Sequence, residues 1–104
     1  MSRAGDLITW WTGDALMVFD ADTLQYKYTV TRSGTDAPVG PATVMAGQLL
    51  VPVTTGYDVF DPATGTGDRH IPVARPPVDG PVVPAVAGAM VLEQRGGDLV
   101  ALGS

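Results

Sequence analysis

The chain has 104 residues, of which 45% are apolar and only 16% charged, and its formal net charge is −5 at pH 7. One domain is the most that this length supports, and the six scattered Lys and Arg residues form no basic stripe, so we expect no nucleic-acid partner. The 13 glycines and 9 prolines break the chain too often for long helices and favour an all-β fold, while the lack of cysteine excludes disulfides and thiolate metal sites.

The N-terminal stretch MSRAGDLITWW does not have the pattern of a signal peptide, because no long apolar run precedes a small-residue cleavage site. No segment of the chain approaches about 18 uninterrupted apolar residues, so we expect no membrane insertion. Residues 1–4 are expected to be too few to form a strand before the apolar run that begins at Leu7.

Adjacent tryptophans, Trp10 and Trp11, stand in the first expected strand. Neighbouring residues of a strand point to opposite faces of the sheet. We therefore expect one of them to pack between structural units and the other to face a neighbouring unit or a partner. Packing is the main expectation, with ligand or peptide contact as the alternative.

The hexapeptide VFDADT, which begins at Val18, is nearly repeated as VFDPAT from Val59, 41 residues later. The same offset maps Gly47–Val51 onto Gly88–Leu92 and adds Val100 to the series. Three units are predicted, at 5–30, 41–73 and 81–102. A period of about 40 residues without a helical apolar stripe is typical of β-propeller blades. An ordinary β-sandwich or barrel is the alternative.

The middle unit predicts a four-stranded antiparallel meander. Its strands are expected near 41–45, 48–53, 57–61 and 68–73, separated by glycines or by Asp-Pro. The run 49–53 lacks polar alternation, which indicates that both of its faces are covered by stacked sheets. Pro52 cannot donate to a ladder, so it is expected near a strand end or facing a gap.

The repeated Asp-x-x-Thr segments are interpreted as turns. Asp61 can accept backbone N–H bonds, Pro62 fixes φ, and Gly65 can take a positive φ. In the first copy Leu24 replaces that glycine, so a different or less tight turn is expected after Asp20. The predicted turn-forming positions are Asp20, Thr23, Asp61, Thr64 and Gly65. Too few acidic positions are present for a calcium loop, and no metal site is expected.

No residue pattern predicts catalysis. His70 is the only histidine, and Ser, His and Asp lack the ordered spacing of a catalytic triad, so surface or inter-unit packing is expected for it. We expect no enzyme activity and no cofactor. The connections 31–41 and 73–81 have the composition of rim loops, which names no ligand.

The pattern V-F-D-x-x-T-G, followed by an aromatic and repeated at a spacing near 40, resembles the repeat of the PQQ-like (quinoprotein-dehydrogenase-like) β-propellers. In that family the turn leads to a docking Trp on the fourth strand. Tyr28 stands at this position in the first unit and Arg69 in the second. The C-terminal GDLVALGS is similar to the family's third strand, with Leu102 where Asp is usual. The residues that hold quinone and calcium in catalytic members cannot be mapped here, so the resemblance implies a non-catalytic scaffold, and an extracytoplasmic location by analogy alone.

The expected blades are incomplete. Strands lettered A to D from the centre give B-C-D, A-B-C-D and A-B-C, whereas propellers close with about four to eight blades. Both ends should expose apolar faces, and the edge at Val100–Leu102 should accept another strand. The candidate interaction surface is Trp10, Trp11, Val100 and Leu102. The expected partner is a protein, either a second copy or a chain that supplies further blades. The alternatives are a fragment of a quinoprotein-type enzyme and a compact β-sandwich binding module.

Overall fold

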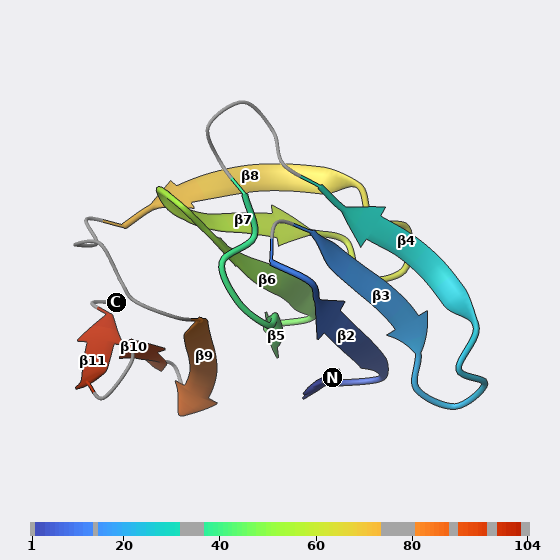
Figure 1. Cartoon of the computed structure of the whole chain (residues 1–104), viewed down its shortest axis with the longest axis horizontal. Helices are drawn as coiled ribbons and strands as arrows, with labels where there is room; N and C mark the ends of the chain where they lie inside the picture. The colour runs from blue at the N-terminus through green and yellow to red at the C-terminus, as the bar shows by residue number, and fades with distance from the viewer. Residues whose placement is uncertain are drawn as a thin grey trace.

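The computed structural model describes residues 2–13, 15–31, 37–73, 81–87, 90–95 and 98–102. Within these ranges the chain forms eleven strands and no helix, and the strands make three antiparallel sheets (Figure 1). The prediction of an all-β fold is confirmed. The sheets are not closed into a ring over the described ranges.

The first sheet contains β1 (Ser2–Ala4), β2 (Leu7–Trp11), β3 (Leu16–Asp20) and β4 (Tyr26–Val30), in that order. The expectation that residues 1–4 are too few for a strand is wrong. Gly5 takes a φ of 57°, which lets the chain reverse at once, so that Ala4 pairs with Leu7 and is buried in the core.

The second sheet is the predicted meander of β5 (Thr43–Met45), β6 (Gln48–Val53), β7 (Gly56–Phe60) and β8 (Gly67–Pro72). Both faces of β6 are buried, as the absence of polar alternation predicts. Pro52 is the penultimate residue of β6, and its carbonyl accepts a hydrogen bond from the Val39 amide at 2.8 Å. The segment that carries Val39 therefore runs beside the end of β6.

The third sheet has three described strands, β9 (Val82–Ala87), β10 (Met90–Arg95) and β11 (Asp98–Leu102), with β10 in the middle. Arg95 pairs with Asp98 across its hairpin as Val53 pairs with Gly56, which makes the offset between the second and third units 42 residues. The series Val18, Val59, Val100 is therefore wrong at its third member. Ala101, rather than Val100, occupies the position of Val59, because the hairpin turns set the register.

The three sheets stack through their side chains. The first and second sheets share one buried core, and the second and third share a smaller one. The inner strands lie side by side, β1 next to β5 and β5 next to β9, so the sheets follow one another along an arc (Figure 1). The first core is formed by Ala4, Leu7, Leu16, Val18, Val30, Ala42, Leu49, Val51 and Val53, and the second by Leu50, Tyr57 and Val59.

Candidate functional site

The face of the first sheet that points away from the second sheet is apolar and open. We call it the N-terminal face: Ile8, Trp10, Met17, Phe19 and Tyr26. Trp10 pairs with Met17 and Ile8 with Phe19 across β2 and β3, and the Phe19 and Tyr26 rings meet edge to face at 6.0 Å. Trp10 is 45% exposed, and no sheet of the described residues packs on this face. Contiguous exposed apolar faces are typical of interaction surfaces.

The third sheet has a matching open face on its far side. We call it the C-terminal face: Leu92, Gln94, Leu99 and Ala101. Leu99 is 70% exposed and Ala101 is also exposed. None of the four side chains is charged, so covering this face would not strand a buried charge.

The two open faces defined above do not include Trp11, Val100 or Leu102. Trp11 packs against the first core and its indole Nε1–H donates to the Pro38 carbonyl at 2.8 Å. Val100 pairs with the buried Glu93, on the side of β11 that faces the second sheet, and is half-buried. Leu102 ends β11, and its side chain lies outside the described residues. Of the predicted interaction residues, Trp10 alone is a large side chain that the structure shows on an open face.

Strand register makes the open faces equivalent to faces that are covered inside the chain. Trp10, Val51 and Glu93 share one position in the three sheets, and Leu16, Tyr57 and Leu99 share a second. Leu16 and Val51 are buried in the core between the first two sheets. Tyr57 and Glu93 meet between the second and third. The members of these two sets that no other sheet of the described residues covers are Leu99 and Trp10.

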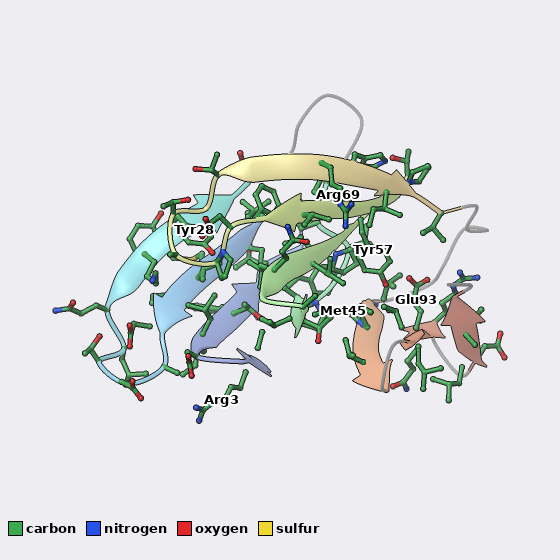
Figure 2. The ribbon with its side chains drawn as sticks, turned by 180° about the vertical axis from the view of Figure 1, so that it is seen from behind. Arg3, Tyr28, Met45, Tyr57, Arg69 and Glu93 are labelled. Carbon is green, nitrogen blue, oxygen red and sulfur yellow. The ribbon has the colours of Figure 1, made fainter. Side chains whose placement is uncertain are left out.

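A buried polar cluster joins the second and third sheets. The Tyr57 hydroxyl donates to Glu93 Oε2 at 2.5 Å, and Arg95 Nε donates to Glu93 Oε1 at 2.6 Å. The Glu93 side chain is fully buried and that of Arg95 is 12% exposed. Figure 2 shows Tyr57 and Glu93 pointing toward each other from the two sheets. Because a buried carboxylate is costly without its partners, this cluster favours one placement of the third sheet on the second.

A second joint connects the outer strand of the first sheet with a turn of the second. The Tyr28 hydroxyl donates to the Pro62 carbonyl at 2.9 Å, and the Tyr28 ring lies so close to Gly65 that a Cβ there would be 2.7 Å from it. Burial, and then the negative charge of Asp61, raise the pKa of Tyr28 to about 12. The residue at the docking-Trp position thus contacts the turn of the next unit.

The turn that contains Asp61 is closed by its own side chain and backbone. Asp61 Oδ1 accepts the Ala63 amide at 2.8 Å, and its carbonyl accepts the Gly65 amide at 2.8 Å. Thr64 Oγ1 accepts the Thr66 amide at 3.3 Å. Gly65 has a φ of 73°, which L residues rarely adopt.

The first copy of this turn is closed in the same way. Asp20 Oδ1 accepts the amides of Asp22 at 2.8 Å and Thr23 at 3.1 Å, which hold the pKa of Asp20 below its usual value, Thr23 contributing more. The Leu24 amide donates to the Asp20 carbonyl at 2.8 Å. Leu24 reaches a φ of 60° although it is not glycine. The expectation of a different or less tight turn is therefore wrong, because the hydrogen bonds impose the left-handed backbone.

A series of surface hydrogen bonds links β7, β8 and the β6–β7 turn. No sequence motif indicated it. His70 Nδ1 lies 2.7 Å from Asp58 Oδ1, and His70 Nε2 lies 3.2 Å from Thr55 Oγ1. Asp58 and His70 are register partners across the two strands, which the repeat alone did not reveal. All three side chains are at least partly exposed to solvent, and these hydrogen bonds connect β8 with β7 and with the β6–β7 turn. Across the described ranges no group of three or more His, Asp or Glu side chains is placed to hold a metal ion.

The predicted rim loops lie mostly outside the described residues; of the first, Thr31 and 37–41 are described, and of the second, Val73 and Pro81. Over the described part of the chain no helix is long and apolar enough to cross a membrane. The sequence matches no protein-family model and no curated protein. The chemistry of the two open faces therefore carries the functional argument.

Proposed function

We propose that the chain is a non-catalytic β-propeller segment that acts as a protein-binding scaffold, with the N-terminal and C-terminal faces as its binding surfaces. One observation carries the proposal. Each open face is the register equivalent of a face that is buried against another sheet inside the same chain. A face built for sheet stacking binds another sheet.

The joints between the units support the propeller interpretation. Equivalent hydrogen bonds close the Asp20 turn and the Asp61 turn. Tyr28, at the end of one unit, contacts Gly65 in the turn of the next. The resemblance to PQQ-like propellers places a docking aromatic at this position. The inner strands also run beside one another, as the inner strands of propeller blades do.

The outer edge of β11 supplies a further binding element. In the first two sheets the corresponding strands β3 and β7 are each paired on that side, with β4 and β8. β11 has no such neighbour within the described residues. An unpaired edge accepts an extended segment of another chain, so a bound sheet can add a strand here as well.

The experiment covers the N-terminal face with a further unit and reads out Trp10. The sequence holds two tryptophans, so the variant Trp11→Phe leaves Trp10 as the sole indole. A second copy of residues 38–80 is fused ahead of residue 1, so that its residues 74–80 serve as the connection to β1 and the face of Leu50 and Val59 is presented to Trp10. At a dilution at which the unextended chain is a monomer by light scattering, we expect Trp10 fluorescence to shift to the blue relative to that chain and to resist acrylamide quenching.

The matched control carries Leu50→Asp and Val59→Asp in the appended copy only. Its Trp10 should remain as accessible to acrylamide as in the unextended chain. If the unaltered appended unit folds and Trp10 stays equally quenchable, the N-terminal face does not bind a sheet of this kind and the proposal is wrong.

A further inference from the structure

We infer that the protein bound by the two open faces is a second copy of this chain, joined head to tail so that two chains close one ring. This inference rests on the proposed function, whose open faces it assigns to each other. The C-terminal face of one copy covers the N-terminal face of the next, and the same contact forms again on the other side of the ring.

The register predicts which side chains meet at this new joint. Inside the chain the position of Tyr57 in one sheet meets the position of Glu93 in the next. The corresponding residues at the free ends are Leu99 and Trp10. These two are among the large exposed apolar side chains of the molecule, at 70% and 45% exposure. A leucine opposite an indole makes an apolar joint where the internal joint is polar.

The chemistry of the two faces fits this pairing. The N-terminal face is aromatic and aliphatic apart from the exposed Arg3, which pairs with Ile8 at its inner edge, and the C-terminal face is aliphatic with one glutamine, Gln94, so neither face carries an acidic side chain. Each chain has a net charge of −5, and faces without acidic side chains keep the repulsion between copies away from the contact. Burial of Trp10 and Leu99 supplies the apolar area that stabilises it.

The number of sheets selects two copies. The described residues of one chain form three sheets, which is fewer than the smallest propeller has blades, and those of two copies form six. Propellers close with about four to eight blades, and three copies would exceed that range. A head-to-tail contact of this kind closes into a ring when its rotation matches the number of units, and a two-chain ring satisfies both open faces.

Site-directed cross-linking tests the predicted contact. The protein has no cysteine, so Ile8→Cys and Ala101→Cys each introduce one thiol, and both leave Trp10 and Leu99 in place. Their equivalents inside the chain, Val91 and Val59, pack in one cluster between the second and third sheets. Stacked sheets lie about 10 Å apart, so the reagent is a bismaleimide of about that span.

A mixture of the two single variants should yield a two-chain product by mass spectrometry, and each variant alone should yield at least about tenfold less. A dominant product from Ile8→Cys alone would mean that like faces pair, and would overturn the head-to-tail inference. No product from the mixture would overturn it as well.

Leu99→Asp tests the contribution of the apolar joint without a cross-linker. It should raise the dissociation constant of the two-chain form at least tenfold, the effect of losing one strongly contributing interface residue. Ile71→Asp is the matched control, because Ile71 is 38% exposed but lies on β8, the outer strand of the second sheet, away from both open faces. It should leave the association unchanged, and equal weakening by both variants would refute the assigned joint.

The two proposals fail differently. If the chain does not self-associate but the appended unit still shields Trp10, the second-copy inference is wrong and the sheet-binding faces stand. If the appended unit also leaves Trp10 accessible, the proposed function itself is wrong.

Discussion

Removal of the Tyr57 hydroxyl should reveal how strongly the buried polar cluster depends on complete pairing. In Tyr57→Phe the fully buried Glu93 loses a donor at 2.5 Å while Arg95 remains at 2.6 Å. A hydrogen bond to a charged group contributes about 1.5–3 kcal/mol, so we expect the free energy of unfolding to fall by about 2 kcal/mol.

Replacement of both partners should cost less than replacement of one. In the double variant Tyr57→Phe, Glu93→Leu no carboxylate is left in the core, and Arg95, which is partly exposed, can turn to solvent. Substitution of apolar residues for a whole buried polar group is often close to neutral, so most of the lost stability should return.

The assay is urea unfolding followed by circular dichroism at one fixed protein concentration at which the chain is a monomer by light scattering, because association would otherwise shift the midpoint. Tyr26→Phe is the matched control, since the Tyr26 hydroxyl pairs with Thr29 on the surface, and it should change stability by less than about 0.5 kcal/mol. A Tyr57→Phe variant as stable as this control, or a double variant less stable than Tyr57→Phe, would contradict the dependence of the buried Glu93 on its hydrogen-bond partners.

Three further predictions concern the turns and the Tyr28 joint. Gly65→Ala should lower the free energy of unfolding in urea by about 1–3 kcal/mol, because residue 65 has a φ of 73° and the new Cβ would meet the Tyr28 ring. Leu24→Gly should leave the free energy of unfolding unchanged or raise it by up to about 1 kcal/mol. A larger loss from Leu24→Gly than from Gly65→Ala would contradict this. The pKa of Tyr28 in the folded protein is about 12, above the unfolded value near 10. The contribution of the neutral Tyr28 hydroxyl to stability should therefore be complete below about pH 10 and decline as the pH rises toward 12. Thermal melts of Tyr28→Phe should lack this decline. The pKa of Asp20 is lowered, so the contribution of its carboxylate to stability should be present above the ordinary pKa of 3.8 and vanish as the pH falls through the folded value. An NMR titration that finds an ordinary Asp20 pKa would contradict the turn geometry.

The fold class and the middle sheet could be predicted from the sequence because their signals are local. Strand 48–53 is apolar without alternation, and the structure buries both of its faces. The adjacent tryptophans also followed from strand alternation, with Trp11 in the core and Trp10 exposed.

Other features depend on register, which similar letters do not determine. Val100 matches Val59 by spelling, but the hairpin that pairs Arg95 with Asp98 moves Ala101 into that position. The short strand β1 was missed because its stability comes from pairing with β2 and from the burial of Ala4.

The sequence repeat does not indicate the polar cluster between the second and third sheets. Tyr57 and Glu93 are 36 residues apart, and their equivalents elsewhere in the chain are apolar. The chain of hydrogen bonds through His70 was hidden for the same reason, since only the pairing of β7 with β8 brings Asp58 beside it. Contacts between units follow from stacking geometry, which one unit's sequence does not contain.

The mass of the unaltered protein in solution, measured by light scattering over a dilution series, distinguishes a two-chain ring from a single chain. If two copies close a ring through Trp10 and Leu99, the mass should be about twice 10.8 kDa at high concentration and fall toward 10.8 kDa on dilution. A mass of 10.8 kDa at every concentration, in a folded protein with Trp10 still open to acrylamide, would contradict the account.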